Sequence, residues 1–327
     1  MNRDINSRAG AHPDRVFQGH SPAQDIAIET RNLGRMFGDV QAVVDLNLSV
    51  PAGSIFGLIG PNGAGKTTTI KMLLGLIQPT AGGASVLGRD ILTDSLWIRS
   101  RVGYVMETQA MYGYLTVGET LSFCRRLYPR WNDELVRGYC KSFGLPLERK
   151  VGKLSKGMKT QLALILALGP DPDLLILDEP TSGLDPVRRH EFLTTVIGEI
   201  AGTGKTVFLS SHQLSEVERV CDHIGIINRG TLILSGSLDQ IKAQEKKVRI
   251  ITQGALPEEI MRMPQVRKVE PEGAGYLISI SGAVDAVIDR LRALPHSFLE
   301  TIDMNLEEIF MDYVGAPDSC KTPREGE

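Results

Sequence analysis

The residues with the clearest chemical potential lie in one glycine-rich stretch, GPNGAGKT, which runs from Gly60 to Thr67. It fits the pattern G-x-x-x-x-G-K-[ST], in which glycines allow backbone N–H groups to turn inward around phosphates. In such a loop Lys66 reaches the β- and γ-phosphates, and the Thr67 hydroxyl ligates Mg²⁺. The stretch therefore predicts a site for nucleotide phosphates and a magnesium ion.

A second chemical feature is the acidic pair at the end of LLILDEP, Asp178 and Glu179. A carboxylate that ends a buried apolar strand costs free energy unless it holds a metal or a hydrogen-bond network. We expect Asp178 to hold Mg²⁺ through water and Glu179 to polarise a water for attack on the γ-phosphate. The alternative, two solvated acids at a strand end, leaves their occurrence beside a phosphate loop unexplained.

The base is predicted to be adenine, since the chain has no N/T-K-x-D sequence of the kind that reads guanine. Phe37 precedes the strand that leads into the loop and is a candidate to stack on the adenine ring. A single phenylalanine is more often a core residue, so this assignment depends on further evidence.

The elements that must position these residues follow from the apolar pattern. SIFGLIG, from Ser54 to Gly60, reads as a buried strand, and Ile70, Leu73, Leu74 and Ile77 recur at helical spacing after the loop. VDLNLSV, Val44 to Val50, alternates as a half-buried strand does. DLLILD and TVFLSS (173–178 and 206–211) suit parallel strands that are covered on both faces. The prediction is an α/β core.

The chain divides by composition into four segments. Residues 1–24 are expected to be a disordered extension, and residues 25–238 the nucleotide-binding domain, with a helical insert at about 96–152. Residues 239–315 are expected to form a small α+β accessory domain without a chemical motif. Residues 316–327 read as a disordered polar tail.

Bulk properties restrict the classes of function. A formal net charge of −3 argues against broad nucleic-acid binding, which needs a basic surface. The four cysteines match no zinc spacing and are expected to be reduced. No run approaches the ~20 apolar residues that span a bilayer, and the first residues lack the apolar core of a signal peptide. The prediction is a cytosolic protein whose membrane role, if any, depends on a partner.

The stretch LSKGM, Leu154 to Met158, resembles the LSGGQ signature of ATP-binding cassette (ABC) proteins. SGLD, which ends at Asp185, resembles the D-loop of that family, and SSH places His212 as its switch histidine. These motifs occur in the family's order and at its spacing, from Ile26 to about Ser235. The resemblance implies a mostly parallel sheet with an antiparallel β part and a helical subdomain.

The resemblance also implies a site shared by two chains. Two such domains would sandwich two ATP molecules, with Ser155 and Gly157 touching the γ-phosphate bound by the opposite subunit's loop. Lys156 and Met158 depart from the commonest signature residues, and the role of Lys156 stays open. The residues predicted to bind ATP are Phe37, Gly60, Pro61, Asn62, Gly63, Ala64, Gly65, Lys66, Thr67, Thr68, Ser155, Gly157 and Asp185; Glu179 and His212 are the predicted catalytic residues.

The family's Q-loop places Glu107, not Gln109, at the position of its glutamine. Both the GYV that ends at Val105 and the LTVGE that begins at Leu115 give this frame. We expect Glu107 to join Thr67 and Asp178 in holding the metal or its water. A carboxylate there adds negative charge beside phosphates, which Lys66 and the metal must offset.

A single cassette without membrane spans resembles the ATP-binding subunit of a transporter whose permease is a separate chain. YPRW at Tyr128, LSKGMK and a C-terminal domain ending NLEEIFMDYV resemble the branch that exports drugs, peptides and antibiotics. The implied partners are that permease and a second nucleotide-binding subunit, at the inner face of the cell membrane. The alternatives are a soluble cassette ATPase of DNA repair or the ribosome, and a P-loop kinase, which does not explain the signature.

Overall fold

The computed structural model describes residues 25–182 and 184–314, and its centre is a six-stranded sheet in the order β11-β10-β4-β9-β8-β7. The five adjacent strands from β10 to β7 run parallel to one another, and β11 pairs antiparallel with β10. Every residue of β8 and β9 is buried, which confirms the prediction from their continuous apolar runs. The strands are β4 (Ile55–Ile59), β7 (Val102–Val105), β8 (Leu174–Asp178), β9 (Thr206–Ser211), β10 (His223–Asn228) and β11 (Thr231–Ser237).

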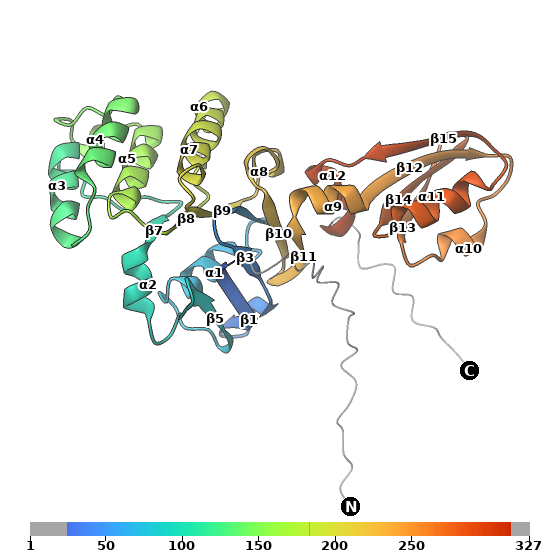
Figure 1. The fold of residues 1–327 in the computed structure, drawn as a ribbon, viewed down its shortest axis with the longest axis horizontal. Helices are drawn as coiled ribbons and strands as arrows, with labels where there is room; N and C mark the ends of the chain where they lie inside the picture. Colours follow the sequence, from blue (N-terminus) through green and yellow to red (C-terminus); the bar gives the residue numbers. More distant parts are fainter. Residues whose placement is uncertain (1–24, 183, 315–327) are drawn as a thin grey trace, which may run out of the picture.

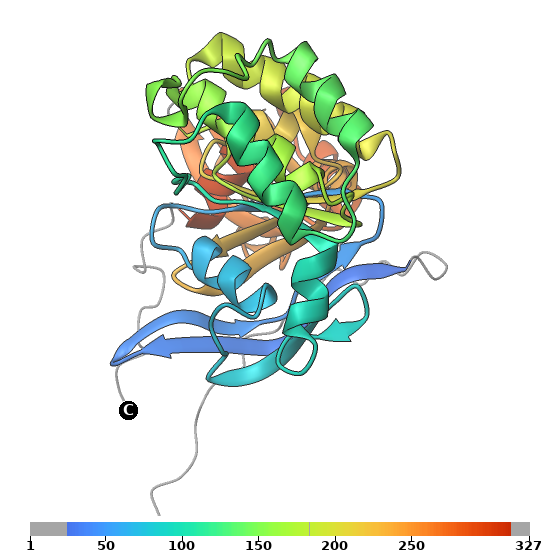
Figure 2. The ribbon, with the colours of Figure 1, turned by 90° about the vertical axis from the view of Figure 1, so that its left-hand side faces the viewer.

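An antiparallel sheet of order β2-β1-β5-β6, with β3 paired to β1, lies below the central sheet in Figure 2. Its strands are β1 (Ile26–Phe37), β2 (Val40–Leu46), β3 (Ser49–Pro51), β5 (Ala81–Val86) and β6 (Arg89–Asp90). Helix α1 (Lys66–Leu73) and the stacked rings of Phe56 and Phe208, 5.6 Å apart, share one core with this sheet. The fold is therefore an α/β core with an antiparallel part, as expected.

The expected single strand over residues 44–50 is divided in two. Strand β2 ends at Leu46, β3 begins at Ser49, and Asp45 has a positive φ of 46°. The side chain of Asn47 donates to the Asp45 carbonyl and accepts from the Asn32 N–H. The Asn47 side chain thus hydrogen-bonds backbone groups that have no partner strand at this point. Such side-chain to backbone bonds are the reason that asparagine favours turns.

The helical region consists of α3 (Val117–Leu127), α4 (Asp133–Ser142), the short η1 (Val151–Lys153) and α5 (Lys156–Leu168). It has its own apolar cluster, which includes Val117, Val136 and Leu162, and it forms the green group at the left of Figure 1. Its start differs from the expected residue 96. Helix α2 (Ser95–Arg101) leads into β7, which pairs with β8 and so belongs to the central sheet. A four-residue apolar run is too short for its periodicity to show this.

The C-terminal part contains an antiparallel sheet of order β13-β14-β12-β15, with α10 and α11 packed on it. Its cluster includes Val248, Ile278 and Val287. Four strands and two helices agree with the expected α+β character. Helix α9 (Leu238–Gln244) precedes the first strand of this part. The other elements are β12 (Glu245–Thr252), α10 (Glu258–Met261), β13 (Val266–Glu272), β14 (Gly275–Ser281), α11 (Val284–Arg292) and β15 (His296–Asp303).

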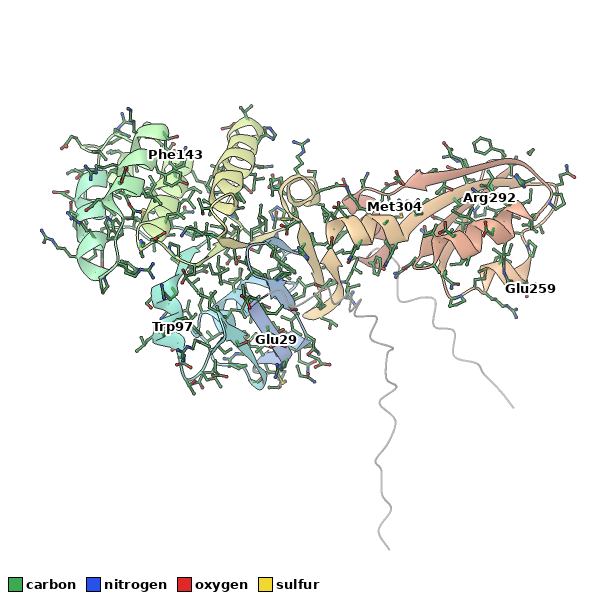
Figure 3. All side chains as sticks on the ribbon, in the orientation of Figure 1. Glu29, Trp97, Phe143, Glu259, Arg292 and Met304 are labelled. Carbon is green, nitrogen blue, oxygen red and sulfur yellow. The ribbon has the colours of Figure 1, made fainter. Side chains whose placement is uncertain are left out.

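The last helix, α12 (Leu306–Val314), packs its apolar face on the nucleotide-binding core, while Glu308 and Tyr313 make polar contacts with β12 of the C-terminal sheet. Met304, Leu306 and Ile309 are buried in one cluster with Val217 of α8 (Leu214–Val220) and with Leu238. Figure 3 places Met304 at the junction and Arg292 at the outer part. The expected accessory segment 239–315 therefore contains a helix that completes the core of its neighbour.

The remaining described elements form a helix after the predicted D-loop: α6 (Pro186–Glu191), the π-helical η2 (Phe192–Ile197) and α7 (Gly198–Ala201). Within residues 25–182 and 184–314, no helix has the length and apolar character needed to cross a membrane. The expected extension 1–24 and tail 316–327 lie outside the described residues.

Candidate nucleotide-binding and hydrolysis site

The phosphate loop connects the end of β4 to the start of α1, as predicted. Gly65 has φ 105°, and a Cβ built there would lie 2.5 Å from the carbonyl oxygen of Ala42. A Cβ on Gly60 would lie 2.2 Å from the carbonyl oxygen of Ile227. Both positions therefore require glycine, and the backbone can approach a ligand closely. The eight-residue α1 directs its unpaired N–H groups at the loop, where an anion would be stabilised.

Lys66 is a buried ammonium group at the centre of the site. Its Nζ donates to the carbonyl of Gly60 at 2.7 Å and to that of Pro61 at 3.3 Å, and it lies 3.2 Å from Glu179 Oε1. Both side chains of this ion pair are less than a tenth exposed. A buried lysine held in this way is a fixed positive charge for a phosphate.

Asp178 and Thr67 meet although they are 111 residues apart in sequence. The Thr67 hydroxyl donates to Asp178 Oδ1 at 3.1 Å, and the Ser210 hydroxyl donates to the same oxygen at 2.7 Å. Sequence reasoning missed Ser210, whose only signal is its position at the end of β9, two residues before His212. Asp178 is 2% exposed, so its carboxylate depends on these partners.

This donor set fits Mg²⁺. The described residues contain no group of three or more histidine, cysteine or acidic side chains suited to a metal ion. Mg²⁺ is usually bound through one or two carboxylates together with substrate phosphates and waters, so the Thr67 hydroxyl and Asp178 are sufficient protein ligands.

Glu179 lies between Lys66 and the predicted switch histidine. Its Oε2 is 2.8 Å from His212 Nδ1, and its own N–H donates to the Ser210 hydroxyl at 3.1 Å. Glu179 has φ 48°, a strained backbone conformation for a residue with a side chain, and such strain is often found at functional sites. The carboxylate is 7% exposed and held from two sides, which suits a group that orients one water.

One cavity of about 430 Å³ brings these groups together. Glu107 lines it and Gln109 does not. The Gln109 amide donates to the carbonyl of Met106 at 3.2 Å, and its side chain lines a different cavity, beside the helical region. The described lining residues are Ala42, Asn62, Gly63, Ala64, Gly65, Lys66, Thr67, Thr68, Glu107, Glu179, Ser182 and His212.

Other predicted ligands lie outside this lining. Phe37 is exposed near the tip of the β1–β2 hairpin, with the Arg35 guanidinium 4.5 Å from its ring centroid. Ser155 caps α5, where its hydroxyl accepts the N–H of Met158 at 3.2 Å. Asp185 is exposed at the start of α6, where its carbonyl accepts the N–H of Arg189. Gly157, in the first turn of α5, is buried.

The fold and the cavity define a P-loop nucleotide-binding protein. Residues 43–182 match the family model described as ABC transporter. The chain is 42% identical over 225 residues to "Probable multidrug ABC transporter ATP-binding protein YbhF" of Escherichia coli (strain K12), covering 67% of this chain and 39% of that protein. It is 40% identical over 222 residues to "Bacitracin transport ATP-binding protein BcrA" of Bacillus licheniformis, covering 67% and 72%.

A solved structure described as an ATP binding subunit of an ABC transporter superposes with a TM-score of 0.61 and 31% identity, covering 66% of this chain and 92% of that one. This chain belongs to the ABC transporter family, and its fold is that of the family's ATP-binding cassettes. It spans about 39% of the length of YbhF. The names of these two relatives concern multidrug and bacitracin transport, which supports the predicted resemblance to the drug- and antibiotic-exporting branch.

Proposed function

We propose that this protein is the Mg²⁺-dependent ATP-hydrolysing subunit of a membrane transporter, and that it drives a separate permease for export. The observation that carries the proposal is the convergence of Lys66, Thr67, Glu107, Glu179 and His212 on one cavity, beside the buried Asp178. These side chains come from segments spread over more than a hundred residues of sequence, and together they match the charges needed for phosphoryl transfer.

In this mechanism, the loop from Gly60 to Thr68 binds the phosphates through backbone N–H groups, and Lys66 balances their charge. Thr67 and Asp178 would hold the metal, which would neutralise charge on the phosphates. Glu107 lines the same cavity and would hold the ion or a water bound to it. Glu179 accepts a proton from the attacking water, and His212 fixes the orientation of that carboxylate through the 2.8 Å contact.

The proposal includes a second cassette subunit. Ser155 begins a helix whose N–H groups suit an anion, yet it does not line the cavity of its own chain. Ser155, Gly157 and Asp185 do not line the cavity of their own chain. In the proposed dimer they would instead contact the ATP bound by the opposite subunit.

Export through a partner permease is supported by the names of the relatives, which concern multidrug and bacitracin transport. The protein would then lie at the cytoplasmic face of the membrane, held there by the permease. None of the similar proteins named above points to a DNA-repair or ribosomal cassette, so the transport function is the one proposed.

The test is ATP hydrolysis by the purified chain with and without Mg²⁺, using Lys66→Ala and Glu179→Gln. Lys66→Ala should lose ATP binding, because the charge that balances the phosphates is removed. Glu179→Gln should keep ATP binding and lose turnover by about a hundredfold or more, because general-base catalysis contributes that much. Lys71→Ala is the matched control, since Lys71 is an exposed lysine of the same helix α1.

Near wild-type hydrolysis by the Glu179→Gln protein would contradict the general-base role. Transport is tested separately, by purifying the chain with a membrane protein encoded beside its gene. Stimulation of ATP hydrolysis by that partner supports the transporter assignment, and a neighbouring nucleic-acid enzyme argues against it.

A further inference from the structure

A largely buried ion pair outside the phosphate cavity connects the helix that follows the predicted D-loop to the helix that follows the switch histidine. Arg189 lies on α6 and Glu216 on α8, with Arg189 Nε 2.9 Å from Glu216 Oε1. Their side chains are 22% and 11% exposed. The two helices are in contact through η2, the continuation of α6, and Figure 1 shows this helix beside α8.

Arg189 connects both loops through its guanidinium group. Its Nη2 donates to the carbonyl of Leu184 at 3.0 Å, one residue before Asp185. Its Nη1 donates to the side-chain oxygen of Gln213, the residue that follows His212. The guanidinium group is planar and rigid, so its two hydrogen bonds and its ion pair with Glu216, which point in different directions, fix its orientation.

Glu216 extends the same network to the segment after the acidic pair. Its Oε2 accepts the Thr181 hydroxyl at 3.0 Å, and Thr181 lies two residues after Glu179. Burial raises the pKa of Glu216, while the contacts from Thr181 and Arg189 and the nearby His212 act in the opposite direction. The carboxylate therefore depends on its partners, because an unpaired buried charge is costly.

We infer that Arg189 and Glu216 are positioning residues for ATP hydrolysis, holding the His212 loop and the Asp185 loop in fixed positions relative to Glu179. This inference rests on the proposed function. The imidazole of His212 is 41% exposed and contacts Glu179 Oε2, so its placement depends largely on the loop that carries it. A displacement of that loop by about 1 Å would misalign the groups that orient the water, and such errors are costly in rate.

The experiment measures kcat and KM for ATP, and separately equilibrium ATP binding, in the full chain. Arg189→Gln and Glu216→Gln should each lower kcat about tenfold or more. KM and ATP affinity should stay within about twofold, because no atom of the network lines the phosphate cavity. The double variant should be no slower than the slower single variant, because the two residues act as one unit.

Three further variants make the result specific. Arg219→Gln is the matched control: Arg219 is exposed, lies on α8 and lines the same cavity of about 170 Å³ as Arg189, so its kcat should be unchanged. Arg189→Lys keeps the charge without the planar fork and should recover part of the kcat. Gln213→Ala keeps the ion pair and cuts only the link to the His212 loop, so it tests the inference even if Arg189→Gln fails to fold.

All assays are run at a temperature well below the lowest melting temperature among the wild type and its variants. A wild-type chain without ATP hydrolysis overturns the proposed function, and the inference with it. An active wild type whose folded Arg189→Gln and Gln213→Ala variants keep the wild-type kcat overturns the inference alone. A loss of ATP binding in step with kcat also overturns it, because the network would then support the site only through general stability.

Discussion

At the scale of single residues, Glu107 and Gln109 are two residues apart and have different surroundings. Glu107 lines the cavity that contains the phosphate loop, whereas the Gln109 amide is hydrogen-bonded to the Met106 carbonyl beside the helical region. Sequence spacing predicted this assignment from the flanking motifs. The role of Glu107 stays a prediction, which activity measurements can test directly.

Glu107→Ala should slow basal ATP hydrolysis about a hundredfold. It removes an oxygen that is proposed to hold the metal or its water, and one such contact in a water-excluded site contributes about 2–3 kcal/mol to transition-state stabilisation. Glu107→Gln keeps an oxygen and removes one negative charge, so its effect should be much milder. Gln109→Ala is the matched control and should stay within about twofold of the wild type. If Gln109→Ala is the slow variant and Glu107→Ala is normal, the frame assigned to this loop is wrong by two residues.

At the scale of elements, the start of β12 is joined to α12 by a buried carboxylate. Glu245 is 3% exposed, and its Oε1 accepts the hydroxyls of both Ser281 and Tyr313 at 2.7 Å. Burial raises the pKa of Glu245 above its ordinary value, against the effect of these two hydrogen bonds. Burial also raises the pKa of Tyr313 to about 12, so its hydroxyl remains a donor over the usual pH range.

Glu245→Gln should raise the melting temperature near neutral pH. A carboxyl group with a raised native-state pKa binds its proton more tightly when folded, so it lowers stability as pH rises through the interval between its unfolded and folded pKa values. Glutamine keeps the oxygen that accepts both hydroxyls and removes the buried charge. The gain should shrink as pH falls through that interval, which lies above the ordinary glutamate pKa of 4.5.

Thermal unfolding of the wild type and the Glu245→Gln variant across pH 4 to 8 checks this, with Glu258→Gln as the control. The Glu258 side chain is exposed on α10, so its change should alter stability by less than about 0.5 kcal/mol. A Glu245→Gln chain that melts lower at neutral pH would show that the ionised carboxylate stabilises this junction.

At the scale of the whole molecule, α12 connects the C-terminal part to the nucleotide-binding core. Leu306 is fully buried in the core cluster, whereas Met311 on the same helix is 58% exposed. Leu306→Ala should lower the free energy of unfolding by about 2–5 kcal/mol, because a buried leucine is replaced by a cavity. Met311→Ala should change it by less than about 0.5 kcal/mol. Thermal or urea unfolding measures both, and equal effects would argue against α12 as part of the core.

The pairing of two chains is tested by mixing inactive subunits. Ser155→Arg should block the helix end that is proposed to face the ATP of the opposite subunit, and Lys66→Ala should disable the subunit's own phosphate loop. In a mixed dimer both defects fall in one composite site, and the other site is intact. Mixing should therefore restore part of the ATPase activity that each variant lacks alone. Full activity from a strictly monomeric wild-type chain would refute the shared site.

The sequence by itself determined the local chemistry of this protein. The phosphate loop from Gly60 to Thr67, the acids Asp178 and Glu179, and the parallel strands that carry them follow from short motifs and continuous apolar runs. Such patterns can be predicted because each depends on neighbouring residues: glycines where the backbone must turn, apolar side chains where both faces of a sheet are covered.

Only the tertiary structure decided which distant residues meet. It places Ser210 on Asp178, joins Arg189 to Glu216, assigns β7 to the central sheet and returns α12 to the nucleotide-binding core. The spacing of polar residues such as Ser210 and Glu216 does not predict which residue, tens of positions away in the sequence, will be their hydrogen-bond partner. An amphipathic helix such as α12 shows that it has an apolar face but not which core covers it, because burial of apolar surface is non-directional.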